Sequence, residues 1–283
     1  MVCAGSAMNR SGMERPDETM SAGELTYGGY LKLDQLLSCQ APLSHEHDEL
    51  LFIVIHQSAE LWLKLCLHEL NGARRLIAAD ELSPAFKMLA RTGRAQAQLI
   101  QSWEVLSTMT PADYQRLREH LGTSSGFQSY QYRLMEFILG LRDPRMAEIH
   151  KDDPQHLAAL EAELARPSLY DESLRLLARR GLPIPAAVLE RDLAAPYVPD
   201  AGVEAAWAEI YRNAERHWDL YELAEKLMDL EHHIQLWRYG HVKIVERIIG
   251  FRRGTGGSSG VEYLMNVLTK GFFPELLSVR TIL

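Results

Sequence analysis

The sequence predicts an all-α fold, and three observations predict it. Apolar residues recur at the three-to-four-residue spacing of helices through most of the chain. A period-two alternation rich in β-branched residues persists almost nowhere, which argues against strands. The chain has 283 residues, of which 47% are hydrophobic and 24% charged, so helices can bury a core without disulfides. We therefore expect a helical bundle that carries a small helical insertion.

The chain begins with a polar, acidic stretch. Residues 1–22 have little to bury, so we expect a mobile tail before a single helical domain at 23–283. The tail lacks the apolar centre of a signal peptide. No uninterrupted apolar run approaches the roughly 20 residues that span a bilayer. These features predict a cytoplasmic protein that does not enter a membrane.

The first half of the chain predicts a series of helices, beginning with a short one at about 30–38. The helix at 45–79 starts with acidic residues, which suit a helix N-terminus. It is apolar on every side over 50–55, as expected at the centre of a bundle. Three more helices follow, at 84–107, 111–121 and 129–141.

The helix at 111–121 has clear end signals. Thr110 suits the N-cap, Pro111 the first helical position and Asp113 the third. Gly122 suits the end of the helix. Residues 143–200 differ, because they contain seven prolines between short amphipathic stretches. We interpret that segment as an insertion of small helices on the main bundle.

The second half predicts one long helical pattern at 203–249, with a break near Gly240. A glycine-rich loop at 250–260 separates it from a last helix that begins at about Val261. The loop is not a phosphate-binding motif, because a helix precedes it and it has no P-loop lysine. Its glycines indicate close backbone approach to a ligand, or a flexible linker.

Composition excludes several classes of function. The formal net charge is −8 and the basic residues are scattered, which argues against binding to nucleic acid. Three cysteines without CxxC spacing argue against a disulfide framework or a zinc knuckle.

His241 is a candidate ligand because it lies on the apolar stripe of the long helix, four residues after Trp237. A buried imidazole needs a partner, which can be a protein group or a metal. One histidine among apolar neighbours suits a haem, whereas zinc needs three or four ligands. Gly240 costs roughly 1 kcal/mol relative to alanine in a helix. Either a flat ring packed on the helix or a kink accounts for it.

Two further positions combine polar and apolar character. His56 ends the apolar run of its helix and shares a face with Phe52; it is either a site residue or a core histidine bonded to a neighbour. On the helix at 111–121, one stripe carries an arginine that can bind a carboxylate through paired hydrogen bonds, or can simply lie on the surface. The stripe consists of Tyr114, Leu117, Arg118 and Leu121.

Several strings of the sequence, read together and in order, resemble the tryptophan 2,3-dioxygenase family over most of the chain. Their content is specific enough to outweigh the structural alternatives for each residue taken alone. The strings are LTYGGYL at 25–31; His47-Asp48-Glu49, Leu51-Phe52-Ile53, His56-Gln57 and Glu60-Leu61-Trp62; SSGFQS at 124–129; VERIIG at 245–250; and GTGGSSG at 254–260.

The resemblance implies a haem enzyme that inserts both atoms of O₂ across the indole C2–C3 bond of L-tryptophan and gives N-formylkynurenine. It implies that His241 is the proximal ligand of a b-type haem, active as Fe²⁺. It places His56 on the distal side, facing the indole N–H. The other implied contacts are Arg118 and Tyr114 to the substrate carboxylate, Thr255 to its ammonium, Phe52, Leu117 and Leu121 to the indole, and Trp103 near the haem propionates.

The resemblance also implies a homotetramer in which an N-terminal segment completes a neighbouring subunit's pocket. That arrangement places Tyr27, Tyr30 and Leu31 in the site of another chain. Three alternatives stay open from the sequence: an indoleamine dioxygenase-like enzyme with broader substrate choice, a non-catalytic haem carrier, and a helical scaffold without a cofactor.

Overall fold

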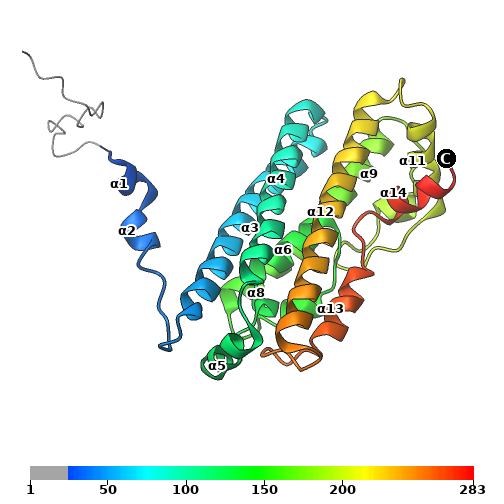
Figure 1. The fold of residues 1–283 in the computed structure, drawn as a ribbon. Coiled ribbons are helices and arrows are strands. Elements are labelled where there is room, and N and C mark those ends of the chain that lie inside the picture. Colours follow the sequence, from blue (N-terminus) through cyan, green and yellow to red (C-terminus); the bar gives the residue numbers. More distant parts are fainter. Residues whose placement is uncertain (1–24) are drawn as a thin grey trace, which may run out of the picture. The chain divides into compact units, whose positions relative to one another are not determined.

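The computed structural model describes residues 25–283, which are helical with no strand in that range. The predicted tail at 1–22 lies outside the described residues. The described residues belong to two compact units, and the boundary between them falls between Ala41 and Pro42. Figure 1 traces both units.

The first unit contains two short helices, α1 (Tyr27–Leu31) and α2 (Leu33–Leu36), neither of which has a buried residue. Thr26 caps α1 by accepting a hydrogen bond from the Gly29 backbone N–H. The prediction of a single helix at 30–38 is wrong. Lys32 adopts left-handed backbone angles, with φ of 53°, and therefore separates the two helices.

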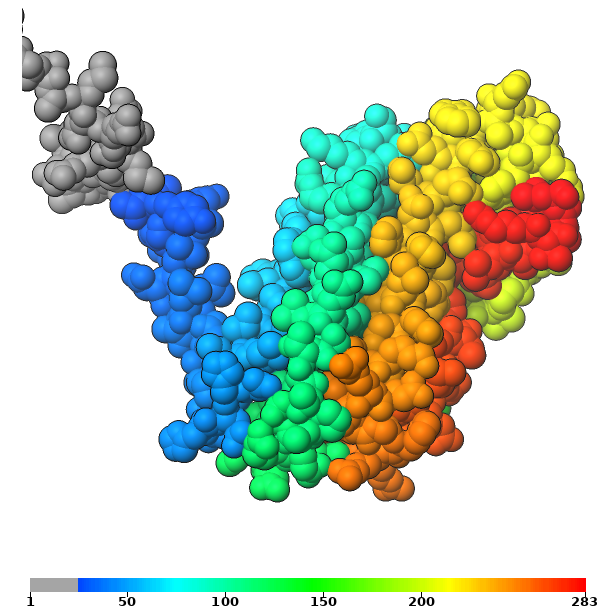
Figure 2. Space-filling view, viewed as in Figure 1, coloured from blue at the N-terminus to red at the C-terminus, as the bar shows by residue number. Residues whose placement is uncertain are grey.

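The second unit is built on three long helices: α3 (Asp48–Ala78), α4 (Leu82–Leu106) and α12 (Trp218–Ile249). In Figures 1 and 2, α4 lies between α3 and α12, and it packs against both. Helices α3 and α4 pack closely at Gly72 of α3, where an added Cβ would lie 2.6 Å from the Met88 sulfur on α4. The predicted helices at 45–79 and 84–107 are confirmed with minor shifts at their ends.

Helix α5 (Pro111–Leu121) begins as predicted. The Thr110 hydroxyl accepts a hydrogen bond from the Asp113 N–H, and the Asp113 carboxylate accepts one from the Thr110 N–H, so the two residues form a capping box. Gly122 ends the helix with a φ of 56°. The adjoining elements are η1 (Gly126–Gln128) and α6 (Tyr130–Leu139).

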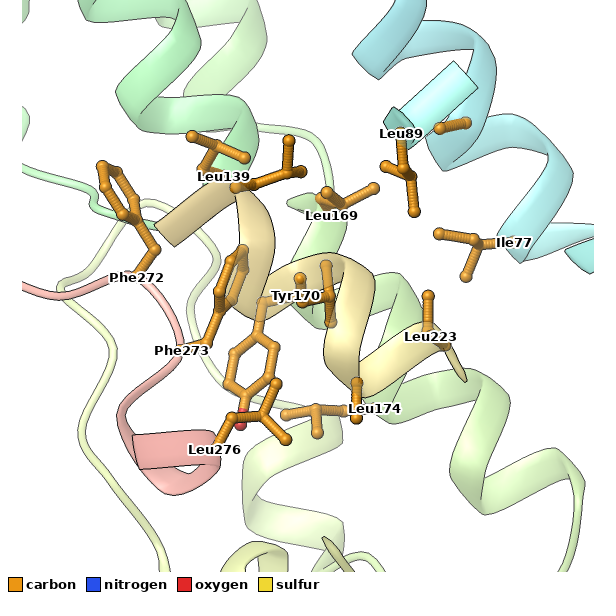
Figure 3. Packing of buried hydrophobic residues seen from close by; sticks show 14 of the residues in the cluster. Ile77, Leu89, Leu139, Leu169, Tyr170, Leu174, Leu223, Phe272, Phe273 and Leu276 are labelled. Carbon is orange, nitrogen blue, oxygen red and sulfur yellow. The ribbon is translucent and has the colours of Figure 1, made fainter. Parts of the chain in front are cut away.

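The proline-rich segment at 143–200 forms four helices, and one of them belongs to the main core. Tyr170, Leu174 and Leu177 of that helix are at most 1% exposed. Figure 3 shows Leu169, Tyr170 and Leu174 packed among core residues from other helices. The four helices are α7 (Arg145–Glu148), α8 (Pro154–Leu164), α9 (Leu169–Arg179), which carries these residues, and α10 (Ala186–Leu189).

The predicted break near Gly240 is wrong, because the long helical pattern breaks at 213–217 instead. Helix α11 (Ala201–Arg212) ends before the break, and α12 then continues through Gly240 without interruption. The last elements are α13 (Val261–Leu268), α14 (Pro274–Ser278) and η2 (Val279–Thr281).

One described helix, α3, is long and apolar enough by composition to cross a membrane, with a mean hydropathy of 1.5 over its most apolar window. The uninterrupted apolar run at 50–55 is short, because His56, Gln57 and Glu60 interrupt it. The second half of α3 lies in the protein core, where Cys66 and Leu70 are fully buried. A core helix passes the same compositional test, so this single segment is weak evidence for a membrane.

Candidate functional site

A cavity of the second unit has a volume of about 1230 Å³, including space open to solvent. Residues of α3, α4, α5, α6, α12 and α13 line it, together with the glycine-rich loops at 122–126 and 250–260. Six residues singled out from the sequence line it together: Phe52, His56, Trp103, Tyr114, His241 and Thr255.

His241 projects from α12 into this cavity. Among the described residues its ring nitrogens have no hydrogen-bond partner. Burial lowers the pKa of His241 to about 4, with a smaller lowering from the nearby His56. The imidazole is therefore neutral at pH 7 and keeps a free lone pair, which is the state that binds iron.

Trp103 of α4 holds the imidazole of His241 from one side. The two rings are stacked, with centroids 5.0 Å apart and planes within 5°. The Trp103 indole N–H donates to the backbone carbonyl of Trp237, at 3.0 Å. A Cβ on Gly240 would lie only 2.5 Å from the indole Cδ1. The flat ring that explains Gly240 in mid-helix is therefore the side chain of Trp103.

His56 lies on α3 at another wall of the same cavity. Its Nδ1 is 2.7 Å from the Phe52 carbonyl oxygen, so Nδ1 carries the proton and donates it there. Burial lowers the pKa of His56, which keeps the ring neutral. The unprotonated Nε2 is consequently a hydrogen-bond acceptor. The Phe52 ring packs against the imidazole at 4.2 Å between centroids.

Of the predicted stripe on α5, only Tyr114 lines the cavity. Leu117 is 1% exposed and packs in a small apolar cluster with Phe52, Tyr114 and Leu121. Arg118 is not among the residues that line the cavity. Its Nη2 donates to the backbone carbonyl of Arg253, at 2.7 Å, and so ties α5 to the glycine-rich loop at 250–260.

That loop also contacts the glycine-rich loop before α6. The Thr255 hydroxyl donates to the Ser124 carbonyl at 2.6 Å. A Cβ on Gly256 would lie 2.7 Å from the Ser125 Cβ, so the two backbones approach too closely for a larger residue. Both loops therefore form one rim of the cavity.

Sequence reasoning missed a group of polar and aromatic residues that also line the cavity. Tyr132 and Arg133 come from α6, and Trp237 and Arg238 from α12. The sequence carried a signal, because Arg133 stands in a largely apolar helix. The structure buries it, leaving 4% exposed. A buried arginine in such a helix indicates a charged partner or ligand.

The donor set of the cavity fits a haem better than a bare metal ion. No group of three or more His, Cys, Asp or Glu side chains in residues 25–283 is placed to hold a metal. A haem needs a single axial imidazole and apolar walls. His241 supplies the first, and aromatic and aliphatic side chains supply the second. The fold and the cavity thus define a helical protein of the haem-binding class.

Comparison with known proteins narrows this class. The family model described as tryptophan 2,3-dioxygenase matches residues 11–283. A relative of that name from Erythrobacter litoralis is 64% identical, and the match covers 92% of this chain and 99% of the relative. Another, from Bacillus cereus, is 55% identical, and the match covers 95% of this chain and 96% of the relative. In Cupriavidus necator the identity is 55%, over 92% of this chain and 88% of the relative. The chain belongs to the tryptophan 2,3-dioxygenase family.

The predicted site residues of the first unit share one short helix. Tyr27, Tyr30 and Leu31 all lie on α1, where they are 76%, 69% and 41% exposed. Their expected role in a neighbouring subunit is a prediction that these observations leave untested.

Proposed function

We propose that this protein is a haem-dependent dioxygenase that oxidises L-tryptophan to N-formylkynurenine in the cytoplasm. Both atoms of O₂ enter the product as the indole C2–C3 bond opens. The observation that carries the proposal is the pairing, in one cavity, of a partnerless neutral His241 with a second neutral imidazole, His56. Family membership supplies the reaction.

His241 is the residue that would hold the haem, and the apolar walls would contact the macrocycle. When bound, the haem iron supplies O₂ binding and the oxidising chemistry. The contribution of this chain would be to keep the imidazole of His241 neutral and oriented. Burial provides the first and the stacked Trp103 provides the second.

His56 is proposed to orient the substrate. Because its Nδ1 proton is committed to the Phe52 carbonyl, Nε2 is the free acceptor for the indole N–H. A hydrogen bond there would fix the position of the indole N–H, which helps an enzyme to present one bond of a ring for reaction. The Phe52 ring beside the imidazole would form an apolar wall for the indole.

Arg118 is proposed to bind the substrate carboxylate, assisted by the Tyr114 hydroxyl. Its guanidinium now bonds a neutral carbonyl of Arg253, and a carboxylate is a stronger acceptor for it. Exchange of the carbonyl for the carboxylate would couple substrate binding to the loop at 250–260. Thr255 in that loop is proposed to contact the ammonium group, and Leu117 and Leu121, which pack with Phe52, to support the indole wall.

We further propose a homotetramer in which α1 completes the cavity of a neighbour. Helix α1 buries none of its own side chains, although Tyr27, Tyr30 and Leu31 are largely apolar. Such exposed apolar residues usually mark an interaction site. Helix α3 also exposes apolar side chains, Leu50 and Leu61 being about half exposed. A second subunit that covers these surfaces would remove them from water.

The deciding experiment is an absorption spectrum of the haem-reconstituted protein with and without L-tryptophan, followed by product identification. We expect a Soret band that shifts on addition of substrate, and N-formylkynurenine under reducing, aerobic conditions. A Soret band without product would indicate a haem carrier. Turnover of D-tryptophan or tryptamine at rates comparable to L-tryptophan would indicate the broader indoleamine dioxygenase-like activity.

A further inference from the structure

The floor of the cavity carries an unbalanced buried charge. Two guanidinium groups, those of Arg133 and Arg238, share one carboxylate, that of Glu136. Arg133 Nη1 donates to one Glu136 oxygen at 2.6 Å, and Arg238 Nη2 donates to the other at 2.8 Å. The side chains of all three residues are at most 5% exposed. The group therefore holds one positive charge in excess, away from water.

The two arginines differ in how completely they are bonded. Every nitrogen of Arg238 has a partner: Nε donates to the Tyr132 hydroxyl at 2.9 Å, Nη2 to Glu136, and Nη1 to the backbone carbonyls of Val267 and Lys270. Arg238 is thus a structural link between α12, α6 and the end of α13. These hydrogen bonds within the protein explain its position in the cavity floor without a ligand.

Arg133 is only partly bonded. Nη1 alone has a hydrogen-bond acceptor among the described residues, and Nε is buried with none. Phe127 covers one face of the guanidinium, at 5.0 Å from the ring centroid. A buried N–H without an acceptor is unfavourable, so an acceptor that reached the unbonded nitrogens of Arg133 would stabilise this arrangement. Arg133 lines the cavity, so a ligand bound in the cavity can supply that acceptor.

Three polar groups in or near the cavity do not supply this acceptor. The Trp103 indole N–H, the polar group expected near the haem propionates, is already committed to the Trp237 carbonyl. Arg118 bonds to the rim loop and does not line the cavity. His150 does not line the cavity, and burial, with smaller effects from the charges of His156 and Arg133, lowers its pKa, so it is not an anion.

We propose that Arg133 binds a propionate carboxylate of the haem, and so anchors the edge of the macrocycle in the cavity floor. This inference rests on the proposed haem site. A propionate would supply the oxygen acceptors that the guanidinium lacks and would neutralise the excess charge of the Arg133–Glu136–Arg238 group. Arg118 is then left free to bind the carboxylate of the substrate. Arg133 would bind the carboxylate of the cofactor, so each carboxylate would have its own arginine.

The test compares the binding of haem with that of haem dimethyl ester, in which both propionates are uncharged. We expect the wild-type protein to bind the ester at least tenfold more weakly, as measured by the rate of transfer to apomyoglobin. In Arg133→Gln the penalty for the ester should shrink at least fivefold, and Arg133→Lys should fall between the two. Wild-type protein that binds both cofactors equally overturns the proposal without any variant.

Controls separate this role from a structural one. Arg145→Gln removes the same charge from a side chain that is 79% exposed, and should leave the ester penalty unchanged. Thermal unfolding of the apoproteins shows whether Arg133→Gln is folded. An ester penalty that is the same in Arg133→Gln as in wild type overturns the proposal. A change instead in the preference for L-tryptophan over tryptamine also overturns it, because Arg133 would then bind the substrate. Both outcomes can occur in an active enzyme, so they differ from a failure of the proposed function.

Discussion

The indole of Trp103 lies flat on the imidazole of His241, with the two ring planes within 5° of each other. The contact joins α4 to α12 at the imidazole that is proposed to hold the haem. It exists because residue 240 has no side chain, so the indole can reach the backbone of α12. A conformationally expensive glycine in mid-helix is thus explained by the ring that packs on it.

Replacement of this glycine tests the contact. Alanine favours a helix over glycine by roughly 1 kcal/mol, so Gly240→Ala would stabilise α12 if space were available. Its Cβ would instead meet the Trp103 ring at 2.5 Å. We expect a net loss of about 1–3 kcal/mol in the free energy of unfolding, because the indole must move in a packed interior. Denaturant unfolding measures it.

Gly93 offers a matched control on α4. It is buried and helical, but a Cβ there would first meet His233 at 3.6 Å, an ordinary contact distance. Gly93→Ala should be neutral or mildly stabilising. If Gly240→Ala is as stable as Gly93→Ala, the stacking of Trp103 does not depend on residue 240.

The apoprotein should lose stability in acid through His241. Its pKa is about 4 when folded, against an ordinary value of 6.5, so the unfolded state binds the extra proton between these values. The contribution of His241 to the free energy of unfolding is fully present above pH 6.5 and decreases as the pH falls toward 4. At pH 4 the loss relative to pH 7 is about 3 kcal/mol. His56 contributes in the same direction. Urea unfolding of the apoprotein from pH 7 to pH 4 measures the loss.

His241→Gln isolates the contribution of that one imidazole. Glutamine does not titrate in this range, so the variant should lose less stability between pH 7 and pH 4 than wild type. Parallel curves for the two proteins would show that His241 is not protonated on unfolding and is more exposed than the structure indicates.

Local signals made much of the fold predictable. The capping box of Thr110 and Asp113 formed as expected because its hydrogen bonds lie within one helical turn. The break at 213–217 was not predictable in the same way, since Asn213 and its neighbours interrupt an otherwise continuous apolar pattern without a proline or glycine. Lys32 is a similar case, because lysine seldom adopts left-handed backbone angles.

The candidate site was predictable where one residue type implied one chemistry, as for His241 and His56. It was not predictable where the role depends on tertiary partners. The excess charge at Arg133 appears only once α6 and α12 bring two arginines to one carboxylate, across about a hundred residues of sequence. The stack of Trp103 on His241 likewise joins two separate helices.

Arg118 provides a direct test of substrate recognition. Arg118→Ala should raise the KM for L-tryptophan at least tenfold, equivalent to about 1.4 kcal/mol, because a charge-assisted contact is lost. Arg116→Ala is the control; that residue lies on the same helix but bonds Glu46 and Asp113 at the surface. Steady-state kinetics that are unchanged in Arg118→Ala would remove Arg118 from the site.

Removal of the N-terminal segment tests the shared cavity. A chain that lacks residues 1–32 has lost α1, with Tyr27, Tyr30 and Leu31, but none of the described core. We expect it to keep most of its haem, since His241 and the cavity walls belong to the second unit, and to lose its activity toward L-tryptophan. The Soret absorbance per chain and the rate of product formation separate the two effects. A chain that lacks only residues 1–22 should stay active. If the longer deletion is also fully active, α1 does not contribute to any subunit's site, because a cavity that works without it is already complete.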